Sequence, residues 1–240
     1  MTTNIPSPSG EVAKRPLEFF WITDYSGSMS GQKIATLNQA IREALPEVKK
    51  ALSHHPQVQV NMRVIKFADD ASWHVGPNAV SLEKFSWPEL DVDGMTATAK
   101  AIDLLADELS FEKMPRRGLP PVCLLISDGF CTDPEQEYIN AINKLITQPW
   151  GKKAVRLAIA IGDESDYDED QLLKFVSHKD IGVLKADNPA KLIKYIKWAS
   201  VTATIGASQA NLKENRNNDN IILSPPPKSQ PTLADSNDVF

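Results

Sequence analysis

The sequence is poor in cysteine and in long apolar runs, and both absences exclude classes of protein. Only two cysteines, Cys123 and Cys131, occur in 240 residues, too few for a disulfide framework or a thiolate zinc site. No apolar segment approaches the length that spans a membrane. Residues 1–16 are polar and contain proline, without the apolar stretch of a secretory leader. We therefore expect a cytoplasmic protein.

Basic residues are also fewer than acidic ones. The chain has 26 Lys and Arg against 31 Asp and Glu, which gives a formal net charge of −5. Without a broad basic field, neither nucleic acid nor an anionic membrane surface is expected as the main partner. Nucleotide binding is not favoured either, because neither Gly-x-Gly-x-x-Gly nor Gly-x-x-x-x-Gly-Lys follows an apolar strand.

Apolar strands alternate with amphipathic helices over most of the chain. The strands are expected at 17–23, 58–65, 71–75, 122–127, 155–161 and 182–184. Helical three-and-four spacing of apolar residues falls between most of them and again after Pro189. This alternation predicts an α/β fold: a doubly wound, mainly parallel six-stranded sheet with one antiparallel edge strand and helices on both faces.

Composition also divides the chain into three parts. Residues 1–16 are predicted to be a flexible lead, and residues 17–204 are predicted to form one domain of ordinary size. Residues 205–240 lack periodicity and contain Ser224-Pro225-Pro226-Pro227. We expect that stretch to be a disordered or docking tail.

Oxygen-bearing side chains follow the ends of two apolar strands. Asp24, Ser26 and Ser28 come after the first strand, and Asp128 follows the fourth. If the strand order is 3-2-1-4-5-6, these two strands are neighbours where the order reverses, which is where ligands bind in such sheets. Thr96, just before another helix, could add a hydroxyl from a third loop. Such hard oxygen ligands suit Mg²⁺, Mn²⁺ or Ca²⁺. Because several of them are neutral, the cation would keep positive charge that a partner's carboxylate could satisfy.

Three short segments carry a resemblance to a known family. Asp24-Tyr25-Ser26-Gly27-Ser28, Gly94-Met95-Thr96 and Ser127-Asp128-Gly129 resemble the three parts of the metal-ion-dependent adhesion site of von Willebrand factor A domains. The likeness covers residues 17 to 204 by element order. Two departures are that Tyr25 stands where a Thr or small residue is usual, and Met95 where glycine is common.

The resemblance implies a set of ligands and a mode of binding. Ser26, Ser28 and Thr96 would bind the divalent cation, with Asp24 and Asp128 supporting it directly or through water. An acidic side chain of a protein partner would take the open coordination position. The implied function is therefore that of a cation-dependent adaptor or scaffold, not an enzyme.

A finer resemblance points to the bacterial tellurite-resistance TerY-like branch of the family. The segments that carry it are 127–133, 158–163 and 196–200. Proteins of that branch are thought to work beside a kinase and a phosphatase in tellurite-stress or phage-defence systems. The resemblance implies a similar setting here.

Other interpretations of these residues stay open. Asp24 alone could cap the following helix, although five oxygen-bearing residues from three loops make that less favoured. A phosphohydrolase could use Asp24 as nucleophile, but Ser26 cannot serve as its second acid and no lysine motif sits at a strand end. A third alternative is a subunit of a metal-chelatase or ATPase assembly.

The acidic run 163–170 is interpreted as a solvated helix start, and Asp133 as a cap for the helix after Pro134.

Overall fold

The computed structural model describes residues 14–163, 165–210 and 221–227. The elements are, in chain order, β1 (Arg15–Asp24), a 3₁₀ turn (Gly27–Met29), α1 (Gln32–Leu52), β2 (Val58–Phe67), β3 (Ala71–Ser81), α2 (Thr98–Glu108), β4 (Val122–Ser127), α3 (Glu135–Thr147), β5 (Val155–Ile161), α4 (Glu169–Phe175), β6 (Val183–Ala186) and α5 (Pro189–Gln209). None of the helices described is both long and apolar enough to cross a membrane.

The six strands form one sheet in the order β3-β2-β1-β4-β5-β6. All neighbours are parallel except β2 and β3, which are antiparallel. The predicted fold class and strand order are therefore confirmed. Thr23 of β1 is in register with Ile126 of β4, so the two strands end side by side.

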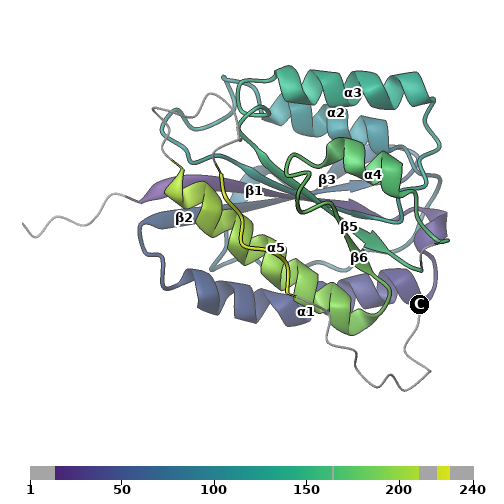
Figure 1. Cartoon of the computed structure of the whole chain (residues 1–240), viewed down its shortest axis with the longest axis horizontal. Coiled ribbons are helices and arrows are strands. Elements are labelled where there is room, and N and C mark those ends of the chain that lie inside the picture. The colour runs from purple at the N-terminus through teal and green to yellow at the C-terminus, as the bar shows by residue number, and fades with distance from the viewer. Residues whose placement is uncertain (1–13, 164, 211–220, 228–240) are drawn as a thin grey trace, which may run out of the picture.

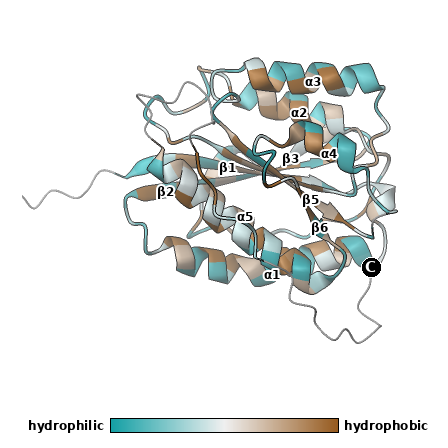
Figure 2. Cartoon of the chain, in the orientation of Figure 1, coloured by the Kyte–Doolittle hydropathy of each residue, from teal (hydrophilic) through white to brown (hydrophobic). Residues whose placement is uncertain are grey.

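Helices cover both faces of the sheet, as Figure 1 shows, with α1 and α5 on one face and α2, α3 and α4 on the other. Side chains of β1 alternate between the two layers: Phe19 and Trp21 pack with α1 and α5, and Phe20 and Ile22 pack with α2 and α3. The inner strands β1, β4 and β5 are buried and apolar along most of their length (Figure 2), because a parallel sheet is buried on both faces. Polar chemistry is therefore placed at the strand ends.

The edge strand β3 is longer than expected. It runs from Ala71 to Ser81, through Gly76 and Pro77, whereas the prediction ends it at Val75. Proline is tolerated on an edge strand because one side of the strand has no partner, and the pairing of β3 with β2 contains register shifts.

The C-terminal boundary also differs from the prediction. Helix α5 continues past residue 204 to Gln209. Within the predicted tail, Ile221 and Leu223 are buried against the α1–α5 layer, while Ile222 between them is 87% exposed. The segment 221–227 is in neither helix nor strand and runs along α5 (Figure 1). Residues 1–13 of the predicted lead lie outside the described residues, and β1 already begins at Arg15. Residues 211–220 and 228–240 of the predicted tail also lie outside them.

Candidate metal centre

Two strand ends bring their acidic residues into one buried cluster. Asp24 Oδ1 accepts a hydrogen bond from the Ser26 backbone N–H at 2.9 Å, and Asp24 Oδ2 accepts one from the Ser127 hydroxyl at 2.6 Å. Ser127 Oγ in turn accepts from the Gly129 N–H at 2.8 Å. Asp24, Ser26, Ser127 and Asp128 are all fully buried. The convergence of β1 and β4 predicted from the sequence is therefore present.

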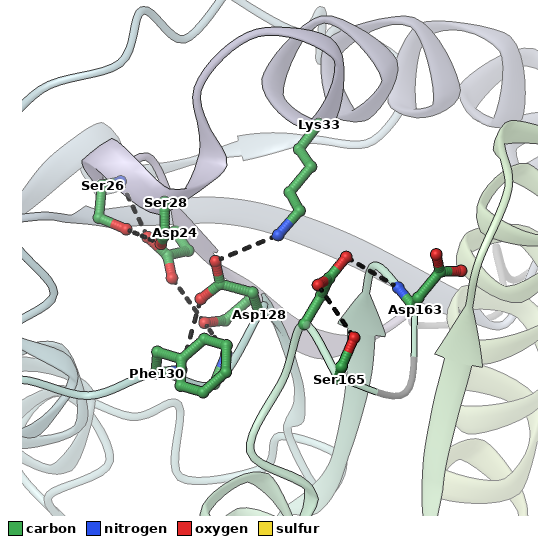
Figure 3. Close-up of polar contacts among 11 residues, drawn as sticks. Asp24, Ser26, Ser28, Lys33, Asp128, Phe130, Asp163 and Ser165 are labelled. Carbon is green, nitrogen blue, oxygen red and sulfur yellow. Dashed lines mark hydrogen bonds and ion pairs between the residues drawn. The ribbon is translucent and has the colours of Figure 1, made fainter. Parts of the chain in front are cut away.

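The serine residues after β1 face each other. The hydroxyl oxygens of Ser26 and Ser28 are 3.0 Å apart, and Figure 3 shows both on the side of Asp24. The same loop is tied to the third loop, because the Gly27 N–H donates to the Gly94 carbonyl at 2.8 Å. Ser28 itself is exposed, so this end of the cluster is open to solvent.

Thr96 belongs to the loop that precedes α2 and is 4% exposed. Its carbonyl accepts hydrogen bonds from the Thr132 N–H at 2.9 Å and from the Thr132 hydroxyl at 3.1 Å. Since Gly94 holds the β1 loop and Thr132 belongs to the β4 loop, the Thr96 loop joins both. All three loops predicted to contribute are thus held together by backbone contacts.

Two glycines allow this close approach. Gly94 has φ +65°, and a Cβ there would lie 2.6 Å from Asp69 Cγ. Gly129 has φ +78°, and a Cβ there would lie 2.8 Å from the Asp168 carbonyl oxygen. Only glycine adopts such a conformation without cost. Each glycine is near a candidate ligand, Thr96 or Asp128, and sets the path of its loop.

Burial changes the acidity of the cluster. Removal from water raises the pKa of Asp24 to about 6, and the nearby Asp128 adds to this, although hydrogen bonds from Ser127 and Ser26 oppose it. Two buried carboxylates without enough positive charge are costly. The cluster is therefore a place where a cation would be stabilised.

Lys33 is the functional candidate that the sequence reasoning missed. It lies in the first turn of α1, and its Nζ is 3.6 Å from Asp128 Oδ2. Figure 3 shows the side chain extending from α1 towards that carboxylate. The sequence shows only that Lys33 lies five residues after Ser28, at the start of the helix that follows β1, and not that it reaches Asp128.

The side chains present fit a hard divalent cation. Asp128 Oδ2 is buried and has no hydrogen-bond donor, although a carboxylate oxygen in the interior normally has one. Within the described ranges no group of three or more His, Cys, Asp and Glu is placed to hold a metal. A cation here would thus need the hydroxyls of Ser26, Ser28 and Thr96 together with Asp24 and Asp128, and such all-oxygen ligation suits Mg²⁺, Mn²⁺ or Ca²⁺.

Two neighbouring acidic features have structural roles. Asp168 is the N-cap of α4 and accepts from the Gln171 N–H at 2.9 Å, so the acidic run before α4 is a helix start as predicted. Asp133 does not cap α3, in contrast to the prediction. Its Oδ2 accepts from the Ala99 N–H in the first turn of α2 at 2.7 Å. The β4 loop folds back on α2 and brings Asp133 to that helix instead.

Comparison with known proteins places the fold. No model of a known protein family matches the chain, and no curated protein matches it in sequence. Solved structures do match. A von Willebrand factor type A protein from Catenulispora acidiphila has 15% identity and a TM-score of 0.58 over 80% of this chain and 43% of its own. The ArnB paralog VWA2 from Sulfolobus acidocaldarius has 16% identity and a TM-score of 0.54 over 75% of this chain and 44% of its own.

A third structure is proximal thread matrix protein 1 from the mussel byssus, with a zinc-occupied MIDAS motif. It has 17% identity and a TM-score of 0.51 over 80% of this chain and 46% of its own. The chain thus spans less than half the length of these three structures, and identities this low speak to the fold alone. The chain has the fold of von Willebrand factor A domains.

Proposed function

We propose that this protein is a divalent-cation-dependent protein-interaction module. A cation, most simply Mg²⁺, would be held by Ser26, Ser28 and Thr96 with Asp24 and Asp128. The observation that carries the proposal is the buried cluster in which Asp128 Oδ2 has no hydrogen-bond donor beside the paired serine hydroxyls. The zinc-occupied MIDAS of the mussel protein, in the same fold, supports it.

An acidic side chain of a partner would complete the coordination of the cation. Only two of the five candidate ligands are charged, so a bound divalent cation is not over-neutralised. We further propose the adaptor or scaffold role, a kinase or phosphatase as the partner, and a TerY-like setting in the cytoplasm. These finer points rest on the sequence resemblance.

One observation favours the phosphohydrolase alternative and another argues against it. Lys33 supplies a cation that the sequence did not place near the acids. However, Asp24 is fully buried and both its oxygens accept hydrogen bonds, whereas a nucleophile needs a free oxygen facing the substrate. We therefore propose a binding role without catalysis. Turnover of p-nitrophenyl phosphate that is lost in Asp24→Asn would overturn it.

Affinity capture tests the binding role. The full chain is used as bait in native lysate, with Mg²⁺ or with chelator, beside a Ser26→Ala bait. The proposal expects a partner that is retained with Mg²⁺ and lost both with chelator and from the Ser26→Ala bait. A partner that is captured equally under all three conditions would show that the metal centre is not the interaction site. The genes adjacent to the one that encodes this chain would distinguish the binding module from the third alternative, a subunit of a metal-chelatase or ATPase assembly.

A further inference from the structure

Two large apolar side chains are exposed beside the candidate metal centre. Met95 is 60% exposed and Phe130 is 47% exposed. Met95 directly precedes Thr96, and Phe130 comes two residues after Asp128. Both side chains therefore stand on loops that also carry a candidate ligand, and exposed apolar side chains in such a place favour a contact surface.

Hydrogen bonds of the backbone fix the positions of both residues in their loops. The Met95 N–H donates to Asp69 Oδ1 at 2.6 Å, and the Phe130 N–H donates to Asp128 Oδ1 at 3.4 Å. Their loops are joined by the hydrogen bond from the Thr132 N–H to the Thr96 carbonyl. The two side chains are thus presented by loops that are fixed to the candidate ligands, and Figure 3 shows the Phe130 ring beside Asp128. A preformed apolar rim binds at a lower entropic cost than a mobile one.

The charges around the centre limit what the partner can carry. Asp69 and Asp93 are exposed on the Met95 side. Asp166 lies on the Lys33 side, since a Cβ added at Gly162 would be 2.7 Å from Asp166 Cβ and 3.5 Å from Lys33 Cε. A bound cation and Lys33 attract one carboxylate, but a second acid of the partner would meet these aspartates and be repelled. The fitting ligand has one carboxylate and uncharged neighbours.

We propose that Met95 and Phe130 form a specificity-determining apolar rim. The rim selects a protein segment in which a single acidic residue is flanked by large apolar side chains. This rests on the proposed function, because the cation holds the acid while the rim contacts its neighbours. Truncating either rim side chain removes apolar burial worth roughly a tenfold change in affinity.

Methionine methyl NMR tests the rim directly. Of the methionines, Met95 is exposed, while Met29 and Met62 are buried in the core and report an intact fold. The full chain with ¹³C-labelled methionine methyls is titrated in Mg²⁺ with three capped peptides: Gly-Phe-Glu-Leu-Gly, Gly-Ser-Glu-Ser-Gly and Gly-Phe-Gln-Leu-Gly. We expect the first to shift the Met95 methyl and to bind about tenfold more tightly than the second. The third should not bind.

Variants then assign the preference to the rim. Met95→Ser and Phe130→Ser should each reduce the tenfold preference for apolar flanks. Phe111→Ser is the matched control, because Phe111 is 57% exposed but follows the far end of α2 from Thr96. Equal binding of the first two peptides, absence of glutamate-peptide binding, or an unchanged preference in the rim variants overturns the inference.

A parallel Mg²⁺ titration by calorimetry separates this inference from the function on which it rests. If Mg²⁺ binds but the flanking residues make no difference, only the rim is wrong. If Mg²⁺ does not bind the wild-type chain, the metal centre fails and the rim fails with it.

Discussion

The ammonium nitrogen of Lys33 lies 3.6 Å from Asp128 Oδ2, a buried carboxylate oxygen without a hydrogen-bond donor. This pairing partly neutralises the two buried acids at the ends of β1 and β4. A divalent cation bound by Asp128 would meet the same ammonium group as a like charge. Lys33 is therefore expected to oppose metal binding.

Lys33→Met should tighten Mg²⁺ binding, because the side chain keeps its length and loses its charge. Repulsion between two unit charges about 4 Å apart is worth about 1 kcal/mol in water and about 4 kcal/mol near a protein surface, so we expect affinity to rise by about tenfold or more. Calorimetric titration of the two proteins measures the change. Lys197→Met is the matched control, since Lys197 of α5 pairs with Glu47 of α1 at the surface. Unchanged or weaker binding in Lys33→Met would mean that the lysine does not oppose the cation.

The raised pKa of Asp24 predicts how pH affects the metal-free fold. Its pKa is about 6 in the folded chain against an ordinary value of 3.8, so the folded state binds more protons between these values. The contribution of Asp24 to stability is then fully present below pH 4 and is lost as pH rises to about 6. The loss is about 1.4 kcal/mol for each pH unit that separates the two pKa values.

Thermal unfolding in chelator at pH 5 and pH 7 checks this for the wild type and Asp24→Asn. The asparagine variant does not titrate at residue 24, so the difference between the proteins isolates this group. The wild type should gain relative stability at pH 5. A difference that does not change with pH would contradict burial as the cause.

The segment 221–227 should contribute to stability through alternate side chains. Leu223 is 7% exposed, and its neighbour Ile222 is 87% exposed. Leu223→Ala should lower the free energy of unfolding by about 2 kcal/mol because it removes buried apolar contacts. Ile222→Ala should change it by less than about 0.5 kcal/mol. Chemical denaturation measures both, and equal effects would argue against the packing of this segment on α5.

Much of the fold could be predicted because its signals are local. The apolar runs of β1 and β4 mark buried strands, and the acids after them mark the strand ends. The 3-2-1-4-5-6 order then brings Asp24 near Asp128. The predicted strand β3 is too short, since Gly76 and Pro77 usually interrupt a strand and only its edge position allows them.

The parts that the sequence does not predict depend on long-range contacts. The reach of Lys33 from α1 to Asp128 depends on how the helix packs on the sheet, which no local pattern gives. The local pattern assigns Asp133 to the helix that follows it, but the fold brings it to Ala99 of α2. Ile221 and Leu223 form too short an alternation to reveal that they are buried.

The central claim is that the oxygen atoms around Asp24 and Asp128 hold one divalent cation. A calorimetric Mg²⁺ titration of the wild type, Ser26→Ala and Asp128→Asn tests it, with thermal unfolding to show that each protein is folded. We expect saturable binding at one site in the wild type and its loss in both folded variants. Binding of equal affinity in all three proteins would contradict the account.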